Sequence, residues 1–430
     1  MRFDLLHPAD QLVMMMSRIY NRGMTTTSGG NLSIRDAGGD VWITPSGVDK
    51  GSLTRDDIMR ILPDGTVLGP HKPSSEYPFH LEVYRRRPEI SAVLHAHSPG
   101  LVAFSIARVL PEMRLTPELE SVCGSIAMAD YRLPGSEALG DVIADSFAEG
   151  HDVVLLENHG VVIGADTIFR AFMRFETLEN SCRLQINALR LGRLRPLSAE
   201  HVRIADAKRR PELSEFIPSR HSSGERALRR ELITLIRRSY AQGLFSSTQG
   251  TYSARLDDGS FLITPYGQDR AYLEVEDLIL IRGGMREAGK TPSRSVGLHE
   301  LIYRTHPDVR SILVAHPPHI MAFAVTEAAF DPRTIPESYI LLRDPGRIPF
   351  GASFMKPEWT AAEFSARRPL VICENDCVIV TGQSLLNAFD RLEVAEFTAK
   401  SILESRDLGP VVHIGAEDIA DIDVAFRLGD

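Results

Sequence analysis

The 430-residue sequence has no excess of positive charge and no long apolar run. Its 48 lysines and arginines are outnumbered by 57 aspartates and glutamates, for a net charge of −9. A chain of this charge spreads no positive field, so we expect neither nucleic acid nor a membrane surface as its main partner. Asp4, His7 and Asp10 interrupt the N-terminal apolar residues, and no later stretch approaches the roughly 18 apolar residues of a membrane span. We therefore expect no secretion signal and a cytoplasmic location.

Cysteine is scarce, with four residues in the whole chain, which argues against a disulfide scaffold. We interpret Cys123, Cys182, Cys373 and Cys377 as buried free thiols, since the last two are not at a usual zinc-ligand spacing. Aromatic residues are also few, at 7%, but 43% hydrophobic and 24% charged residues are ordinary for a globular protein. Disorder and collagen-like repeats are therefore not expected.

One pattern occurs twice in the chain. Thr44-Pro45-Ser46-Gly47 recurs 220 positions later as Thr264-Pro265-Tyr266-Gly267. Further matches join Ser33 with Ser253, His80 with His299, Tyr84 with Tyr303, and Glu157-Asn158 with Glu374-Asn375. The register drifts by only three residues between the first and last of these matches. Duplication of one unit is the simplest account.

The length agrees with a duplication, because single cores rarely grow past about 250–300 residues. We expect one domain over residues 1–200, a linker over 201–225 and a second domain over 226–430. The linker is rich in charge, proline and serine and shows no sustained helical period.

Hydrophobic periodicity predicts helices over residues 12–20, 77–87, 168–189 and 228–240, with Asp166 as the N-cap of the third. Short β-rich runs predict strands over 41–43, 91–97, 153–156 and 161–163, with a hairpin turn at 158–160. These elements predict a central sheet with helices packed over it.

His95 and His97 lie on a predicted strand, where alternate side chains share a face. Their imidazoles can form a metal platform, although two histidines on a solvated strand face would give the same pattern. His159 follows the apolar strand 153–156 and can be directed from the strand end into a cleft. Three imidazoles would suit zinc, and also manganese, iron or cobalt, and they leave coordination positions open for a substrate.

Three segments are rich in small and hydroxyl residues. Pro73-Ser74-Ser75-Glu76 precedes a predicted helix, whose unpaired N–H groups and two hydroxyls can bind an anion beside Glu76. Ser28-Gly29-Gly30-Asn31 and Thr44-Pro45-Ser46-Gly47 can bring backbone donors near an oxyanion. Each segment alone is also an ordinary cap or turn.

In combination, these motifs resemble the class II aldolase/adducin family. The motifs that carry the resemblance are Gly-Asn-Leu-Ser-Ile-Arg at 30–35, Ile-Thr-Pro-Ser-Gly at 43–47, Pro-Ser-Ser-Glu at 73–76, His-Ala-His-Ser-Pro at 95–99 and Glu-Asn-His-Gly at 157–160. The resemblance is strong over residues 8–195 and decayed over 226–405.

The resemblance implies tandem α/β/α domains, each with a mostly antiparallel central sheet. It also implies a zinc-like ion on His95, His97 and His159, with Glu76 as the catalytic acid/base. In phosphate-using members, the phosphate is held by residues matching Asn31, Ser46, Gly47, Ser74 and Ser75.

The second copy has lost these residues. Alignment of the halves places Val314, His316 and Asp376 at the three histidine positions, and Ser295 at the position of Glu76. Thr251 and Tyr266 replace Asn31 and Ser46. We interpret the second copy as a catalytically inactive partner domain, with His316, Asp376 and nearby His319 open as a weak metal pair or group.

Three functions remain open from the sequence. The first is a metal-dependent carbon–carbon lyase of the aldolase type, acting through an enediolate on a small, phosphorylated or unphosphorylated hydroxy-carbonyl compound. The second is a metal-dependent decarboxylase of a keto or hydroxy-aromatic acid, and the third is a non-catalytic adducin-like scaffold. The resemblance implies a homo-oligomer, with a dimer giving a pseudo-tetramer of domains, in which the segment 337–339 is the source of a residue for a neighbouring site.

Overall fold

The computed structural model describes residues 3–206 and 208–428, and these form two compact units. The first unit comprises Met1–Met113 and Glu118–Arg183, and the second comprises Arg114–Pro117 and Leu184–Asp430. Within the described residues, no helix has both the length and the apolar content needed to cross a bilayer. All four cysteines are buried free thiols, as predicted.

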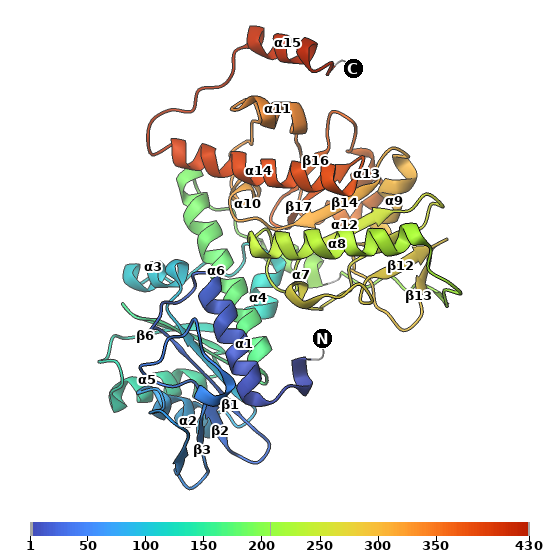
Figure 1. The fold of residues 1–430 in the computed structure, drawn as a ribbon. Coiled ribbons are helices and arrows are strands. Elements are labelled where there is room, and N and C mark those ends of the chain that lie inside the picture. Colours follow the sequence, from blue (N-terminus) through green and yellow to red (C-terminus); the bar gives the residue numbers. More distant parts are fainter. Residues whose placement is uncertain (1–2, 207, 429–430) are drawn as a thin grey trace. The chain divides into compact units, whose positions relative to one another are not determined.

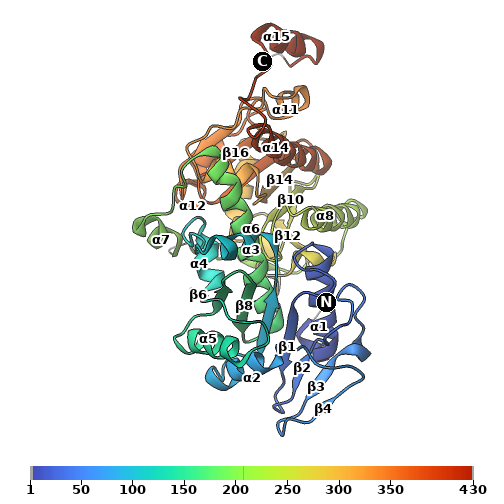
Figure 2. The ribbon, with the colours of Figure 1, turned by 90° about the vertical axis from the view of Figure 1, so that its left-hand side faces the viewer.

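The first unit is built on a sheet with the strand order β4-β3-β2-β1-β5-β8-β7-β6. Figures 1 and 2 label β1, β2 and β3 of this sheet, which lie side by side. Its strands are β1 (Asn31–Arg35), β2 (Val41–Ile43), β3 (Met59–Ile61), β4 (Val67–Leu68), β5 (Ala92–Ala96), β6 (Ile126–Ala129), β7 (Val153–Leu156) and β8 (Gly160–Ala165). Its helices are α1 (Pro8–Asn21), α2 (Tyr77–Arg86), α3 (Pro99–Ala107), α4 (Pro117–Cys123), α5 (Glu137–Ala148) and α6 (Ile168–Leu191), of which α4 begins and α6 ends in the second unit. Only the β6–β7 pairing is parallel among the pairings of this sheet.

Helices cover both faces of this sheet. On one face, α2 and α5 pack over a core that includes Phe79, Val83, Val93, Phe147 and Val154. On the other face, α1 contacts β1 and β2, and α3 contacts β7 and β8. The predicted α/β/α layering and the mostly antiparallel sheet are therefore confirmed.

Local sequence explains where the helices begin. The Nδ1 of His7 accepts a hydrogen bond from the N–H of Ala9 at 3.2 Å, and Pro8 occupies the first turn, where its missing N–H has no cost. In α6 the predicted cap is wrong by one residue, because the hydroxyl of Thr167 accepts from the N–H of Arg170 at 3.2 Å. Asp166 instead forms an ion pair with Arg170.

The apolar face of α6 also changes near its end. Phe172, Phe175 and Cys182 are fully buried as predicted, but Leu189 is 60% exposed. Leu184 and Ala188 are buried instead, and both lie in the hydrophobic core of the second unit. The buried stripe rotates because the last two turns of α6 contribute to a different core.

The second unit contains a sheet with the order β15-β16-β17-β14-β10-β11-β12-β13-β9. Its strands are β9 (Glu215–Phe216), β10 (Thr251–Arg255), β11 (Phe261–Ile263), β12 (Ile279–Arg282), β13 (Met285–Glu287), β14 (Ser311–Ala315), β15 (Gly346–Ile348), β16 (Leu370–Cys373) and β17 (Cys377–Gly382). Its helices are α7 (Ala199–Asp206), α8 (Ser223–Ala241), α9 (Val296–Thr305), α10 (Ile320–Ala324), α11 (Pro336–Leu342), α12 (Ala352–Met355), α13 (Pro357–Ala362), α14 (Leu385–Ser405) and α15 (Ala416–Ala425). Short 3-10 turns at Phe3–Leu5, Arg55–Asp57 and Arg270–Tyr272 complete the described elements.

The two units repeat the same strand pairings. Asn31 pairs with His95 between β1 and β5, and Thr251 pairs with Val314 between β10 and β14. The segment 201–225, expected as a linker, contains part of α7 and the two-residue strand β9, which pairs in parallel with β13. This segment therefore carries regular structure, because its backbone adds to the edge of a sheet.

Candidate metal centre and active site

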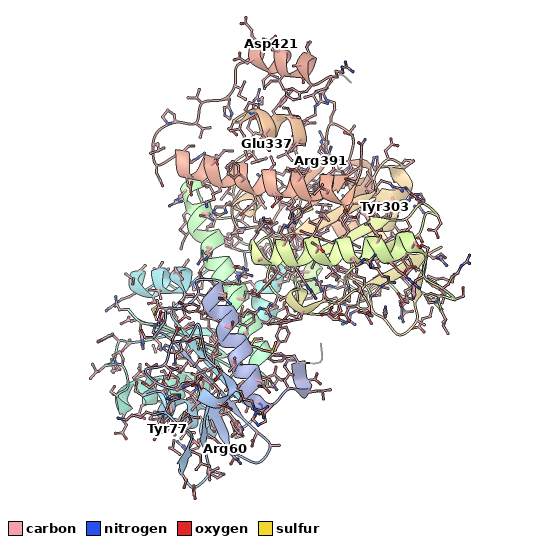
Figure 3. All side chains as sticks on the ribbon, in the orientation of Figure 1. Arg60, Tyr77, Tyr303, Glu337, Arg391 and Asp421 are labelled. Atoms are coloured by element: carbon pink, nitrogen blue, oxygen red, sulfur yellow. The ribbon has the colours of Figure 1, made fainter. Side chains whose placement is uncertain are left out.

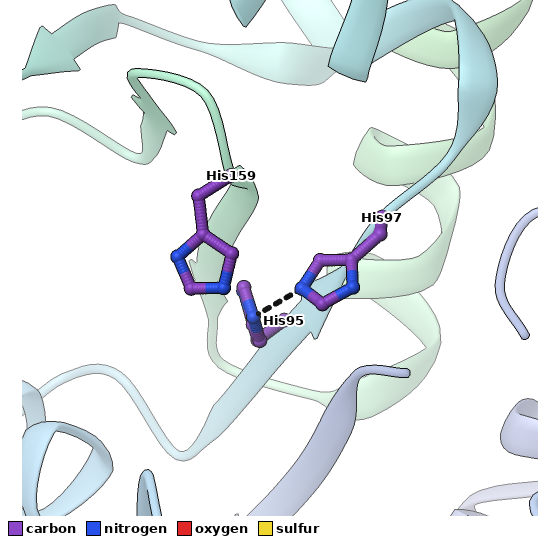
Figure 4. Close-up of side chains that lie close together, drawn as sticks. All are labelled: His95, His97 and His159. Atoms are coloured by element: carbon purple, nitrogen blue, oxygen red, sulfur yellow. Dashed lines mark hydrogen bonds between the residues drawn. The ribbon is translucent and has the colours of Figure 1, made fainter. Parts of the chain in front are cut away.

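Strand β5 supplies the first two histidines of the site. His95 lies within β5 and His97 one residue beyond its end, so the alternation of strand side chains places both on the face covered by α2. Their Nε2 atoms lie 2.9 Å apart (Figure 4). His95 is fully buried.

The β7–β8 hairpin supplies the third histidine. Asn158 has a left-handed backbone with φ 55°, which turns the chain before His159. The N–H of His159 lies 3.2 Å from the Oγ of Ser105 on α3. The ring of His159 lies 4.9 Å from each of the other two rings, measured between centroids, and the potential ligand atoms of the three lie within 4.8 Å of one another.

Two glycines allow the backbone to approach these rings. A Cβ on Gly160 would lie 2.6 Å from the carbonyl oxygen of Ala96 and 2.6 Å from the ring of His97. Gly30 has φ +71°, and a Cβ there would lie 2.7 Å from the carbonyl oxygen of His95. The glycines of the Gly-Asn and His-Gly motifs are thus required by close packing around β5.

The environment of the rings favours neutral imidazoles. Burial lowers the pKa of His95 to about 3 and that of His97 to about 3, and it also lowers the pKa of His159. The Nδ1 of His95 lies 3.0 Å from the carbonyl oxygen of Val161. Because a carbonyl only accepts, Nδ1 carries the proton and Nε2 presents a lone pair, as a metal ligand requires.

Glu76 lies beside all three rings at the start of α2. Its Oε2 is 3.3 Å from the Nε2 of His95, and its Oε1 is 3.7 Å from the Nε2 of His159. Oε1 is buried without a hydrogen-bond partner among the described residues, as is the Nδ1 of His159. A carboxylate oxygen left buried and unpaired beside three neutral imidazoles fits a cation or a substrate proton at this place.

The donor set fits a divalent metal ion. Three convergent imidazole nitrogens suit zinc and other first-row transition metals and leave positions open for substrate oxygens. Within the described part of the chain, His95, His97 and His159 are the only group of at least three potential ligands that converges in this way.

Four of the five residues expected to bind phosphate lie on two adjoining segments, 46–47 and 74–75, in which Ser74 is 7% exposed. Pro45 bridges to Pro73, and the N–H of Ser46 donates to the carbonyl of Lys72 at 2.9 Å, so the turn at 46–47 lies beside the segment 74–75. Ser46, Gly47 and Ser75 are exposed. Asn31 is different, because it is 3% exposed and its Nδ2 donates to the Oε2 of Glu76 at 2.8 Å.

Three residues of this unit have environments that the sequence analysis did not assign. Lys50 is 3% exposed beside the turn at 46–47, where its ammonium donates to the carbonyl of Pro45 at 2.5 Å and burial lowers its pKa to about 8. Glu179 of α6 accepts from the hydroxyl of Ser98 and from the first N–H groups of α3. His80 bonds to Asn31, and its repetition as His299 was the available signal for it.

This constellation is absent from the described residues of the second unit. Asp376 accepts from the hydroxyl of Ser353 at 3.1 Å, and Glu396 accepts from the ring and N–H of His319, repeating the cap that Glu179 provides in the first unit. Asn375 donates to the carbonyls of Leu115 and Arg195, at 2.9 and 2.8 Å. The asparagine of the degenerate motif thus has a structural contact of its own.

Tyr339, in the segment expected to contribute to a neighbouring site, is 7% exposed. Its hydroxyl donates to Asp423 of α15 at 3.0 Å. In this structure the side chain is engaged within its own unit.

A family model matches the chain in two regions. The model describes the class II aldolase and adducin N-terminal domain, and it covers residues 10–186 and again 230–403. The chain belongs to the class II aldolase and adducin family. The predicted duplication is therefore confirmed, since each unit of the structure contains most of one matched region.

Relatives in this family each correspond in length to one matched region. An L-fuculose phosphate aldolase of Methanococcus maripaludis is 37% identical over 166 residues, which are 39% of this chain and 89% of the relative. A 3-oxo-tetronate 4-phosphate decarboxylase of Escherichia coli is 31% identical over 179 residues, 41% of this chain and 84% of the relative. A solved L-fuculose 1-phosphate aldolase is 30% identical with a TM-score of 0.42, covering 46% of this chain and 93% of its own. This member of the class II aldolase and adducin family thus has both an aldolase and a decarboxylase among its relatives.

Proposed function

We propose that this class II aldolase chain is a metal-dependent carbon–carbon lyase of the aldolase type that acts on a small phosphorylated hydroxy-carbonyl compound. The observation that carries the proposal is the convergence of His95, His97 and His159 beside Glu76, with all potential ligand atoms of the histidines within 4.8 Å. The similarity to the archaeal L-fuculose phosphate aldolase supports the reaction class.

His95, His97 and His159 are the proposed ligands of a divalent ion, with zinc preferred for three neutral imidazoles and manganese, iron or cobalt as alternatives. Bound there, the ion would act as a Lewis acid toward the hydroxyl and carbonyl oxygens of the substrate and stabilise the negative charge of an enediolate. The buried, unpaired Oε1 of Glu76 supports a cation at this place.

Glu76 is the proposed acid/base. In aldol cleavage the hydroxyl on the carbon that becomes the aldehyde gives up its proton, which the carboxylate of Glu76 can accept. The electron pair of the breaking carbon–carbon bond stays on the carbon beside the carbonyl, and that carbon must then take a proton. Glu76 is suited to deliver it, because Oε1 has no protein partner among the described residues while Oε2 is held by Asn31. Oε2 thus fixes the orientation of the carboxylate, and Oε1 is the proposed site of proton transfer.

Ser46, Gly47, Ser74 and Ser75 are the proposed phosphate site. The bridge between Pro45 and Pro73 supports this assignment, because it brings two hydroxyl-bearing segments together at the start of α2. A buried lysine adds positive charge behind the turn. Such a site would favour a phosphorylated substrate over its unphosphorylated counterpart.

Decarboxylation of a phosphorylated keto acid is the second candidate, favoured by the similarity to the 3-oxo-tetronate 4-phosphate decarboxylase. In that reaction the breaking bond leads to a carboxylate and releases carbon dioxide. The enolate carbon that remains takes a proton, as in aldol cleavage. The same histidines, the same Glu76 and the same phosphate turns would serve both reactions.

The second unit is the proposed inactive partner, and the chain is proposed to form a homodimer in which four related domains assemble. Val314, Asp376 and Ser295 at the matched positions support the loss of metal binding and catalysis. The boundaries proposed for the two domains are residues 1–200 and 226–430.

Elemental analysis tests the metal site. We expect about one divalent ion per purified chain, lost in His95→Ala and in His159→Ala. His316→Ala, at the matched position of the second unit, is the control and should keep the ion. Absence of metal in the wild type, with none taken up on addition, would instead support a non-catalytic adducin-like scaffold.

Product analysis tests the reaction. The metal-loaded chain is incubated with L-fuculose 1-phosphate and with 3-oxo-tetronate 4-phosphate, and released aldehyde and carbon dioxide are measured. Aldehyde release supports the lyase and carbon dioxide release supports the decarboxylase. Turnover of neither compound, nor of other phosphorylated ketoses and keto acids, by a fully metallated chain would reject both.

A further inference from the structure

A continuous row of hydrogen bonds leads from the sheet to Glu76 in the first unit. The hydroxyl of Tyr84 lies 2.6 Å from the Oγ of Ser33, and that Oγ lies 2.7 Å from the Nδ1 of His80. The Nε2 of His80 lies 2.5 Å from the Oδ1 of Asn31, whose Nδ2 lies 2.8 Å from the Oε2 of Glu76. All members except Glu76 are less than 4% exposed.

The spacing of these residues follows from two secondary-structure periods. Asn31 and Ser33 are two apart on β1 and share the face that α2 covers. Glu76, His80 and Tyr84 are four apart at the start and along one side of α2. Helix and strand therefore present matching rows, and each bond of the series joins one row to the other.

The chemistry of the end group fixes the direction of every bond. An ionised carboxylate only accepts, so Asn31 turns its NH2 to Glu76 and its oxygen to His80. That oxygen only accepts, so the Nε2 of His80 carries the proton. Burial holds the pKa of His80 well below its ordinary value, so the ring is neutral and its Nδ1 accepts from Ser33. The oxygen of Ser33 then accepts from Tyr84, whose own oxygen accepts from the N–H of Val93.

The second unit retains the inner part of this row and has lost its end. The Oγ of Ser253 lies 2.7 Å from the Nδ1 of His299 and 2.6 Å from the hydroxyl of Tyr303 (Tyr303 is labelled in Figure 3). Thr251 stands at the position of Asn31 and bonds to Ser293. The Nε2 of His299 is therefore buried without a hydrogen-bond partner among the residues that the structure describes.

The comparison separates two roles. The second unit keeps Ser253, His299 and Tyr303 although it has no carboxylate at the position of Glu76. These three residues therefore serve the packing of the helix on the sheet. The asparagine and the glutamate are lost together in the second unit, and with the asparagine goes the partner that the Nε2 of His299 would have. The link through Asn31 thus belongs to the unit that holds the histidine cluster.

We propose that Asn31 and His80 are positioning residues for Glu76. His80 fixes the orientation of the Asn31 amide, and Asn31 fixes one oxygen of Glu76, so that the other oxygen points toward the histidine cluster. This role rests on the proposed function of Glu76 as acid/base. Asn31 thus has an orienting contact with Glu76 in addition to the phosphate contact that the resemblance implies. His80 has a role that the sequence did not indicate.

The test compares His80→Leu, His80→Gln and Asn31→Thr in the zinc-loaded full-length chain, with whichever phosphorylated substrate the wild type converts. We expect His80→Leu and Asn31→Thr to lower kcat about 10- to 100-fold, in the range of other outer-shell orienting residues. In His80→Leu the KM should change less than about threefold, because His80 is not among the residues expected to bind substrate. In both variants the zinc content should stay at the wild-type level, because the three histidines are unchanged. His80→Gln keeps an amide donor for Asn31 and should recover most of kcat.

His299→Leu, in the second unit, is the matched control. It removes the same ring from the same position of the repeated fold and should leave kcat unchanged. A kcat within about threefold of wild type in both His80→Leu and Asn31→Thr would overturn the proposal. Loss of zinc in parallel with kcat, or no recovery in His80→Gln, would likewise reject a positioning role.

A readout independent of turnover separates this proposal from the proposed function. Crystal structures of the wild type and of Asn31→Thr, a replacement that the second unit already contains, should show the carboxylate of Glu76 rotated away from its wild-type position in the variant. An undisplaced Glu76 contradicts the positioning role even in an active enzyme. A wild type that converts no substrate, with Glu76 displaced in the variant, rejects the reaction and retains the orienting contact.

Discussion

At the scale of single residues, the same side chain has different surroundings in the two copies. His80 and His299 occupy matched helix positions, and the Nδ1 of each shares a hydrogen bond with a serine hydroxyl. Only His80 has a partner for its second nitrogen. The difference arises on the strand that each helix covers, where β1 has Asn31 and β10 has Thr251. The role of the histidine thus depends on the residue that faces it.

Glu76→Gln is the most direct test of an individual residue. Glutamine keeps the size and one carbonyl oxygen, which can still accept from Asn31, but it cannot carry the transferred proton. We expect metal content to be unchanged and kcat to fall by about 10²- to 10⁴-fold, the usual contribution of a positioned acid/base. Elemental analysis and steady-state kinetics measure the two quantities, and full activity in a metallated variant would contradict the assignment.

The pH dependence of stability follows from the buried imidazoles. The folded pKa values of His95 and His97, about 3, lie below their ordinary 6.5. Between these values the unfolded chain binds more protons than the folded one, so the free energy of unfolding of the metal-free unit should fall as pH decreases from about 6.5. Above pH 6.5 the two imidazoles are neutral in both the folded and the unfolded chain, so they no longer lower the free energy of unfolding.

Tryptophan fluorescence can follow this loss in one unit at a time. The chain has two tryptophans, Trp42 in the first unit and Trp359 in the second. In Trp359→Phe the remaining tryptophan reports the first unit, and its urea midpoint should be lower at pH 5 than at pH 7.5. The difference should shrink in His97→Gln, and equal midpoints at the two pH values would count against neutral buried imidazoles.

At the scale of elements, the β7–β8 hairpin shows why its motif has this composition. Asparagine takes the left-handed position, histidine projects into the site, and glycine allows the end of β5 to pass closely. In the second unit Cys377 stands at the position of Gly160. A side chain is tolerated there, where no group of three histidines converges among the described residues.

Gly160→Ala should therefore disturb the site through the backbone. Its Cβ would lie 2.6 Å from the carbonyl oxygen of Ala96, an atom that cannot rotate away. We expect a loss of about 1–3 kcal/mol in the free energy of unfolding, as for other overpacked positions, and weaker zinc binding. Urea unfolding and a zinc titration would measure both effects.

Gly140→Ala is the matched control on helix α5. Its Cβ would meet only Phe79, at 3.7 Å, which is ordinary contact. In a helix interior this replacement should stabilise by about 0.5–1 kcal/mol and leave zinc binding unchanged. Equal effects of the two replacements would mean that close packing at Gly160 is not what the site requires.

At the scale of the whole molecule, two copies of one fold differ in chemistry. Both keep the strand order around the central strands and the serine–histidine–tyrosine contact. Both also keep a glutamate that caps a helix, namely α3 after β5 in the first unit and α10 after β14 in the second. In the part of the chain that the structure describes, only the first copy has three convergent imidazoles. Features that both copies share serve the fold, and features of one copy serve the site.

Metal binding should therefore slow amide hydrogen exchange in the first unit and leave the second unchanged. Ligand binding stabilises the state that binds it, so zinc should slow amide hydrogen exchange in peptides from β5 and β8. Peptides from β14 and β17, the matched strands, should exchange at the same rate with and without zinc. Exchange mass spectrometry after chelation and after zinc addition gives the comparison, and equal protection of both sets would indicate a second metal site.

Much of this architecture could be predicted from sequence. The helices at α1, α2, α6 and α8 and the strands of the β7–β8 hairpin lie where periodicity indicated, because each buries its own regular stripe. The prediction of buried residues was wrong where one face of a helix packs against a core other than that of its own domain. The end of α6 contributes to another core.

The sequence by itself determined the duplication, the family motifs and the pairing of His95 with His97, because these depend on residue identity and on the two-residue period of a strand. Tertiary structure alone decided that segments near residues 31, 76, 95 and 159 meet at one point, since this requires non-adjacent strands and a helix to pack together. It also decided that Asn31 lies between His80 and Glu76. Hydrogen bonds between distant side chains follow from that packing, and no local period in the sequence encodes them.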